Sequence, residues 1–182
     1  ALNYHLFPLT VQELKKDFDL QKSLLFGHLP AALQEADPKK YLASYITSYL
    51  REEVLQEGLT RNLSAFRHFL EAASFSQGQV LNLSGVARES FVHRKVVENY
   101  FSILYDLLIA KELPAFTKRA KRRLMTHSKF YFFDVGVYRA LRPYGPLDRP
   151  EEIEGTALES LVFQELTAMN EYHALDYRLH YW

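Results

Sequence analysis

The order of segments between residues 82 and 134 constrains the fold of this chain more than any other feature. Apolar periodicity predicts a short helix, the turn Glu89-Ser90-Phe91 and a longer helix within residues 82–108. Two short apolar runs follow, 113–116 and 130–133, and each predicts a strand. Helix, turn, helix and then a hairpin is the order of a winged helix. We therefore expect a winged-helix-like unit over roughly residues 82–134.

The outward face of the longer helix is the best candidate for a binding surface. The first helix is expected to be capped by Ser84. The side chains expected on the buried face of the second helix are Val96, Val97, Tyr100, Phe101, Leu104, Leu107 and Leu108. This leaves Arg94, Lys95 and Asn99 outside, and these residue types hydrogen-bond to base edges in the major groove. Glu98 adjoins the same surface and would repel phosphates, so an interdomain or protein-binding role is the alternative.

The connection between the two predicted strands holds the only concentrated charge in the sequence. Five basic side chains occur within six residues, namely Lys118, Arg119, Lys121, Arg122 and Arg123. On the tip of a wing these charges could contact a phosphate backbone and make binding depend on salt. A solvated hairpin tip, or a patch that faces an acidic neighbouring domain, would explain them equally well.

The rest of the sequence predicts a mainly α-helical chain. Helices are expected over 37–56 and 62–74, and Thr10 with Glu13 forms a capping box. Residues 142–155 are expected to form a loop, followed by a last helix over 156–170. The apolar side chains expected on the inner face of that helix are Leu158, Leu161, Val162, Leu166 and Met169.

Two carboxylates near the end of these segments have ordinary explanations. Thr156 and Glu159 form a second predicted capping box, which alone would account for Glu159. Asp134 is expected to end a strand and open a turn. Glu159 and Glu165 are six positions apart on a helix, so they point in roughly opposite directions and do not form a catalytic pair.

Composition excludes several classes of chemistry. Lys and Arg total 22, as do Asp and Glu, so no global field draws the molecule to nucleic acid or to an anionic membrane. The chain has no cysteine, no Gly-rich phosphate loop, and no pair of histidines spaced as metal ligands on a helix. No metal site is expected. No membrane span or signal peptide is apparent, and a cytoplasmic location is the default expectation.

Several segments, taken in order, are similar to those of one family. They are Leu6-Phe7-Pro8-Leu9-Thr10 with Glu13-Leu14, Tyr45-Ile46, Tyr49-Leu50-Arg51-Glu52-Glu53-Val54, Asn62-Leu63, Phe66, Phe69-Leu70, Val97, Tyr100-Phe101, Leu104, Lys129-Phe130-Tyr131-Phe132-Phe133-Asp134-Val135-Gly136, Gly155, Leu158-Glu159, Val162 and Tyr181-Trp182. In this order the chain resembles prokaryotic AAA-type P-loop ATPases that carry a C-terminal domain of unknown function (number 4143). The resemblance extends over nearly the whole chain.

The resemblance implies a division of the chain into three parts. Residues 1–36 would be the exit from the ATPase core with linking helices, and 37–141 a helical and winged-helix-like domain. Residues 142–182 would be a loop and the first helix of a truncated α/β domain resembling restriction endonucleases. Glu159 matches the acidic position of that domain's first helix, and the remaining acidic positions of a metal site would follow Trp182.

The resemblance also implies cofactors and partners. ATP and Mg²⁺ would bind the parent protein upstream of Ala1, so this chain would hold neither and would not itself be an enzyme. The expected partners are DNA and the protein's own ATPase domain, without a membrane, and an oligomer is possible because such ATPases commonly form rings. We expect a coupling and interaction region of an ATPase. The alternatives are an independent winged-helix DNA-binding module and, least supported, a metal-dependent nuclease.

Overall fold

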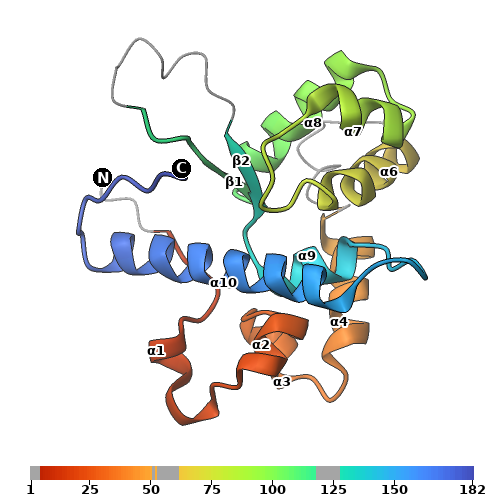
Figure 1. Ribbon diagram of the computed structural model, residues 1–182. Coiled ribbons are helices and arrows are strands. Elements are labelled where there is room, and N and C mark those ends of the chain that lie inside the picture. Colours follow the sequence, from red (N-terminus) through yellow and green to blue (C-terminus); the bar gives the residue numbers. More distant parts are fainter. Residues whose placement is uncertain (1–4, 51, 53–61, 118–127) are drawn as a thin grey trace.

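A computed structural model describes residues 5–50, 52, 62–117 and 128–182, and it is mainly helical with one small antiparallel sheet. Figure 1 shows the elements in order. They are α1 (Val11–Leu14), the 3₁₀ helix η1 (Lys15–Asp17), α2 (Leu20–Phe26), α3 (Pro30–Gln34), α4 (Pro38–Ser44), the π-helical turn η2 (Tyr45–Leu50), α6 (Leu63–Ser74), α7 (Leu83–Ser90), α8 (Arg94–Asp106), β1 (Ala110–Leu113), β2 (Lys129–Phe132), α9 (Val135–Leu141) and α10 (Pro150–Tyr172).

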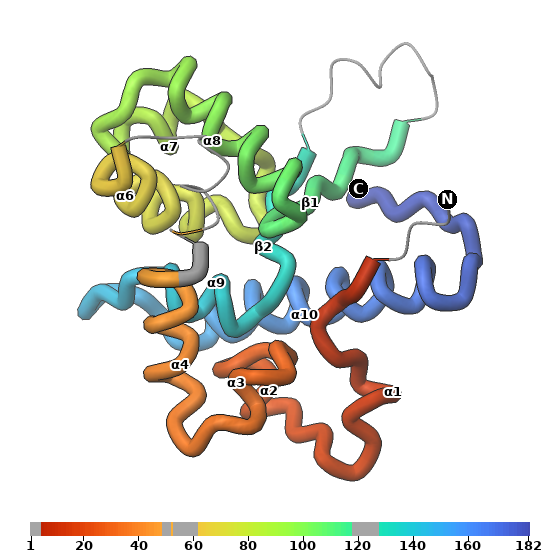
Figure 2. Tube along the Cα trace, turned by 180° about the vertical axis from the view of Figure 1, so that it is seen from behind, coloured from red at the N-terminus to blue at the C-terminus, as the bar shows by residue number. Residues whose placement is uncertain are grey.

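The long helix α10 crosses the middle of the molecule. Helices α1 to α3 lie on one side of it, and α6 to α8 with the sheet lie on the other, as both Figure 1 and Figure 2 show. The short helix α9 is central, because it packs against α2, α4, α6, α10 and β2. Its buried side chains include Val135, Val137, Tyr138 and Leu141. The predicted mainly α class is thus confirmed.

Two predicted helix starts are confirmed in atomic detail. The Thr10 hydroxyl accepts a hydrogen bond from the backbone N–H of Glu13 (3.2 Å), and Glu13 accepts one from the N–H of Thr10 (2.8 Å). This is the predicted capping box. The helix predicted over 62–74 is α6, which begins after Asn62 because the Asn62 side chain accepts from the N–H of Ala65 (3.0 Å).

The helix predicted over 37–56 changes its geometry halfway. It begins after Asp37, as expected, but α4 ends at Ser44 and the chain continues as the π-helical turn Tyr45–Leu50. The Thr47 hydroxyl donates to the carbonyl of Ala43 (2.9 Å), a contact that competes with regular helical hydrogen bonds and bends helices. Of the remaining part of this prediction, residues 51 and 53–56 lie outside the described residues.

A short helix, α7, a turn and a longer helix, α8, are present in the predicted order, with two corrections to the first half. Helix α7 begins two residues earlier than a Ser84 cap requires, because the side chain of Asn82 accepts from the N–H of Gly85 (3.1 Å) and forms the cap. Helix α7 also continues to Ser90, and only Phe91 turns the chain, in the left-handed region with a φ of 56°.

In α8 the buried face differs in part from the prediction. Val97, Tyr100, Phe101 and Leu104 are buried, as expected, and Ile103 is buried as well. Val96 and Leu108 are exposed, Leu108 by 51%, and Leu107 is only half-buried. Leu107 and Leu108 lie beyond the last helical residue, Asp106, so they leave the line of the apolar stripe.

The hairpin is shifted in sequence relative to the prediction. The first strand is Ala110–Leu113, three residues before the predicted start, and it pairs antiparallel with β2 from Ala110↔Phe132 to Leu113↔Lys129. On its other side β2 bonds to the segment that joins α6 to α7. There the N–H of Gly78 donates to the carbonyl of Phe130 (2.8 Å), and Phe130 donates to Gln79 (3.0 Å).

The last part of the chain differs most from the prediction. A helix, α9, follows Asp134 where only a turn was expected. Helix α10 begins at Pro150, since proline suits the first helical position, so the predicted loop over 142–155 is too long. Thr156 therefore lies inside the helix and its hydroxyl donates to the carbonyl of Glu152 (3.0 Å). The predicted second capping box is wrong.

Helix α10 also packs against the protein through a different face from the one predicted. Of the five side chains expected inside, only Leu161 is buried, whereas Leu158, Val162, Leu166 and Met169 are 42–50% exposed. The packed face consists mostly of small or polar residues, namely Ile153, Ala157, Ser160, Leu161, Gln164 and Ala168. We call the exposed set Leu158, Val162, Leu166 and Met169 the α10 stripe.

Candidate functional site

The outward side of α8 carries the three residues predicted to face a ligand. Arg94, Lys95 and Asn99 are all exposed. Lys95 and Asn99 are four positions apart, so they lie on one face of the helix, one turn above the other. Helix α8 contacts α7 and β1, which places this face in the same unit as the hairpin (Figure 1). We call Lys95 and Asn99, with Arg94 beside them, the α8 polar face.

The Arg94 side chain makes two contacts within the protein. Its Nε lies 3.0 Å from a carboxylate oxygen of Glu98, and a terminal nitrogen donates to the Ser84 hydroxyl over 3.3 Å. This pairing ties the start of α8 to α7. The positive charge of Arg94 also offsets the negative charge of Glu98, which would otherwise repel phosphates from the neighbouring Lys95.

The five basic residues of the predicted wing, Lys118, Arg119, Lys121, Arg122 and Arg123, lie outside the described residues. The strand register fixes only where the connection begins and ends, because Leu113 pairs with Lys129 at the end of the hairpin next to the connection. The prediction that these residues contact a ligand therefore stays a prediction.

Glu159 lies apart from the α8 polar face and binds the second strand. One of its carboxylate oxygens accepts from Lys129 Nζ (2.8 Å) and from the Tyr131 hydroxyl (2.6 Å). Partial burial acts to raise the pKa of Glu159, but these two hydrogen bonds and the Lys129 charge outweigh it and hold the pKa below its usual value. Within the described part of the chain no group of three or more acidic or histidine side chains could hold a metal ion.

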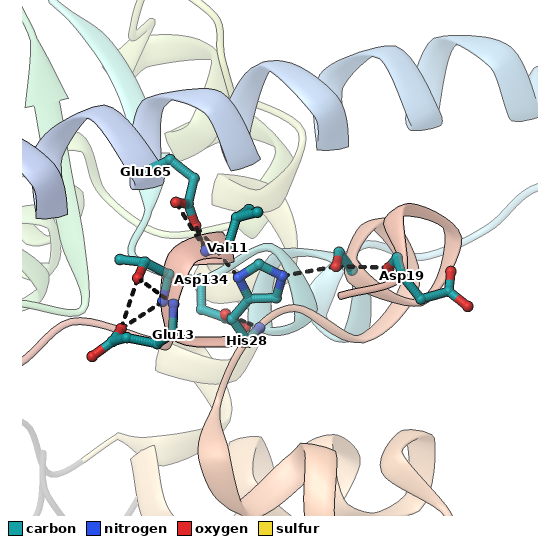
Figure 3. A network of polar contacts seen from close by, with 8 residues as sticks. Val11, Glu13, Asp19, His28, Asp134 and Glu165 are labelled. Carbon is teal, nitrogen blue, oxygen red and sulfur yellow. Dashed lines mark hydrogen bonds and ion pairs between the residues drawn. The ribbon is translucent and has the colours of Figure 1, made fainter. Parts of the chain in front are cut away.

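A buried polar network joins the N-terminal region to the centre of the fold (Figure 3). Asp134 is fully buried and caps α9, because it accepts from the N–H of Val137 (3.1 Å). It also accepts from the N–H of His28 (2.8 Å). Burial raises the pKa of Asp134 in spite of these hydrogen bonds, which act in the opposite direction.

The other half of the network surrounds the His28 ring, which lies between Glu165 and Asp19 in Figure 3. Nε2 of His28 is 2.7 Å from the Ser23 hydroxyl, and Nδ1 is 3.6 Å from a carboxylate oxygen of Glu165. This serine–histidine–carboxylate order has the connectivity of a hydrolytic triad. However, Ser23 and His28 are 3% and 0% exposed, so a substrate cannot reach the hydroxyl, and the cluster is structural.

No pattern in the sequence indicates this network. Its members come from α2, the turn after it, the β2–α9 junction and α10, so no local spacing connects them. The one available signal was the pair Asp134 and Gly136. An aspartate is a preferred N-cap residue, and the glycine two positions after it indicates a place where another backbone segment can approach closely.

These features define a mainly helical protein with a two-stranded sheet, a polar helix face beside the hairpin and a buried polar network. The chain belongs to a family described as a domain of unknown function (DUF8612), whose model matches residues 17–148. The match includes α7, α8, the hairpin and α9 and ends before α10. No curated protein and no solved structure matches the chain. None of the helices in the described ranges has the length and apolar character to cross a membrane.

Proposed function

We propose that this chain is an interaction region that contacts nucleic acid through the α8 polar face and the adjoining β1–β2 hairpin. The observation that carries the proposal is the exposure of Lys95 and Asn99 on α8, next to a hairpin whose connection is strongly basic. The order α6, bridging segment, α7, α8, β1 and β2 is that of a winged helix, in which the last helix enters the major groove.

Local electrostatics support the same surface. The formal net charge of the chain is zero, so attraction to phosphates has to come from a patch. Glu98, the acidic residue between Lys95 and Asn99 in sequence, is paired with Arg94 over 3.0 Å. The lysine and the asparagine thus remain available to a ligand.

We propose further that the parent protein is a prokaryotic AAA-type ATPase, which would bind ATP and Mg²⁺ outside this chain. The ordered resemblance along nearly the whole sequence supports this parentage. A coupling role is supported by contacts that connect the N-terminal segment to the hairpin through α10. Glu165 accepts from the N–H of Val11 (3.1 Å). Six residues earlier in the same helix, Glu159 binds Lys129 and Tyr131 of β2.

Fluorescence anisotropy of a labelled DNA duplex at two salt concentrations tests the nucleic-acid contact. We expect micromolar binding that weakens steeply with salt, and a loss of binding when Lys118, Arg119, Lys121, Arg122 and Arg123 are neutralised together. The variant Lys95→Ala with Asn99→Ala should also bind more weakly, whereas the exposed Lys22→Ala on α2 should bind like the parent chain. Flat anisotropy to high protein concentration contradicts the proposal.

The ATPase parentage has its own test. Deletion of this region from the longer protein should change the ATP hydrolysis rate if the region couples nucleotide state to a bound partner. Unchanged hydrolysis, with and without DNA, would argue against coupling and would leave the DNA contact as a separate question.

A protein-contacting role for α10 is the second candidate, and the α10 stripe favours it. Four large apolar side chains on one solvent-facing side of a helix are unusual for an isolated surface. A stripe of this kind fits α10 serving as the first helix of an α/β unit resembling restriction endonucleases. Substitution of Val162 and Leu166 by lysine should abolish packing of the α10 stripe against the rest of such a unit. DNA binding by α8 should remain unchanged.

A further inference from the structure

A small cavity lies where the N-terminal segment crosses the sheet and α10. It has a volume of about 180 Å³ and is lined by His5 to Pro8, by Lys111 of β1, by Phe132, and by Phe163 and Gln164 of α10, among others. This volume is below the roughly 300–1,000 Å³ of sites for drug-sized ligands, so it suits a molecule of about one ring.

Lys111 brings a positive charge to this cavity, and the Glu171 carboxylate that also lines it pairs with His5 instead. Its Nζ lies 4.1 Å from the centroid of the Phe7 ring, a cation–π contact. No carboxylate of the described residues lies within ion-pair distance of it. Burial lowers the pKa of Lys111, and the more distant Glu171 only partly offsets this effect. A bound anion would therefore relieve the cost of a half-buried ammonium group.

Gln164 supplies a second unused polar group. It lines the cavity and is only 7% exposed. Neither its amide nitrogen nor its amide oxygen has a hydrogen-bond partner within the described part of the protein. A buried carboxamide without partners costs free energy, and a ligand hydroxyl could pair with either atom.

From this combination we propose that the cavity binds a small aromatic carboxylate. The carboxylate pairs with Lys111 Nζ, the ring packs against Phe132 and Phe163, and a ring hydroxyl pairs with the amide of Gln164. A phosphate ester fits less well, because Glu171 lines the same cavity and repels a doubly charged group. This site is separate from the α8 polar face, so the proposal does not depend on nucleic-acid binding.

The segment over the cavity is held in place by its own contacts. His5 pairs with Glu171 over 2.5 Å, and the N–H of Phe7 donates to the Tyr172 hydroxyl over 3.0 Å. Phe7 and Tyr172 also meet edge to face, with ring centroids 5.4 Å apart. Occupation of the cavity should further hold this segment in place and protect the amide of Phe7 from hydrogen exchange.

Titration of the full chain with sodium benzoate and with 4-hydroxybenzoate, followed by ¹H–¹⁵N NMR, tests the proposal. We expect saturable shifts for residues around the cavity and tighter binding of 4-hydroxybenzoate. Lys111→Met should weaken the binding of both ligands by about tenfold or more, because it removes a charge-assisted contact and leaves the side-chain volume nearly unchanged. Gln164→Leu should remove the preference for the hydroxylated ring and leave benzoate binding intact.

The control variant is Lys95→Met, an exposed lysine on α8, which should bind both ligands like the parent chain. Melting temperatures of all three variants establish that they are folded. The proposal is overturned if neither ligand produces saturable shifts at the cavity, or if folded Lys111→Met binds benzoate as tightly as the parent chain.

Discussion

The backbone N–H of His28 donates to a carboxylate oxygen of Asp134 over 2.8 Å, although 106 positions separate the two residues. Around this bond two glycines allow backbones to touch. A Cβ on Gly136 would lie 2.1 Å from the carbonyl oxygen of Phe26, and one on Gly27 would lie 2.2 Å from Asp134. The end of α2 is thereby fixed against the start of α9. Because Asp134 lies two residues after the end of β2, the same contact fixes the hairpin on the helical base.

Replacement of Asp134 by alanine should destabilise the fold strongly. The change leaves the buried N–H groups of His28 and Val137 without acceptors, which should cost roughly 2–5 kcal/mol. Urea unfolding monitored by circular dichroism measures the loss. The matched control is Asp19→Ala, which removes an exposed helix cap and should cost about 1 kcal/mol. Equal costs for the two variants would contradict a central role for Asp134.

A pair of glycine substitutions separates close packing from helix propensity. Gly136→Ala forces a methyl group into the Phe26 carbonyl and should cost at least about 2 kcal/mol. Gly155 also lies in a helix, α10, but a Cβ there meets nothing within 4 Å. Gly155→Ala should stabilise the protein by about 0.5–1 kcal/mol. Thermal unfolding of both variants checks these opposite signs, and a stabilising Gly136→Ala would refute the described contact.

The stability supplied by Glu159 should depend on pH. Its folded-state pKa is below the usual value of 4.5, so its contribution is complete above that pH and is lost as pH falls through the lower folded-state value. Glu159→Gln lacks this titration. The difference in the free energy of unfolding between the parent chain and Glu159→Gln should therefore be constant from pH 7 to about pH 5 and shrink below about 4.5. A difference that grows on acidification would reverse the assigned sign.

Leucines on the packed face and on the exposed α10 stripe should respond differently to truncation. Leu161 is 4% exposed, and Leu161→Ala should cost about 2–5 kcal/mol. Leu158 is 44% exposed, and Leu158→Ala should change stability by no more than about 0.5 kcal/mol. Chemical denaturation of the two variants under identical conditions decides the matter. A comparable loss for Leu158→Ala would mean that the α10 stripe is packed rather than free.

Local signals predicted much of the helical framework. Thr10 with Glu13 and Asn62 act through their nearest neighbours, so their sequence spacing is enough to place a helix start. The buried face of α8 was also largely predictable, because Val97, Tyr100, Phe101 and Leu104 recur at helical spacing.

The errors arise where distant segments decide the outcome. The apolar side chains of α10 gave a clear periodicity, but the packed face is the one with Ala157, Ser160 and Ala168, where small residues face the other helices. The local sequence predicts Glu159 as part of a helix cap. Its partners are instead Lys129 and Tyr131, which belong to a strand some 30 positions away. The His28–Asp134 contact has no local pattern at all.

The contact with nucleic acid is tested most directly by a ¹H–¹⁵N NMR titration of the chain with a DNA duplex. We predict salt-dependent shifts that cluster on α8 from Arg94 to Ser102 and on the β1–β2 hairpin. The amide resonances of the α10 stripe residues should not shift. No shifts at millimolar DNA, or shifts confined to α10 between Leu158 and Met169, would contradict the assignment of α8 as the binding surface.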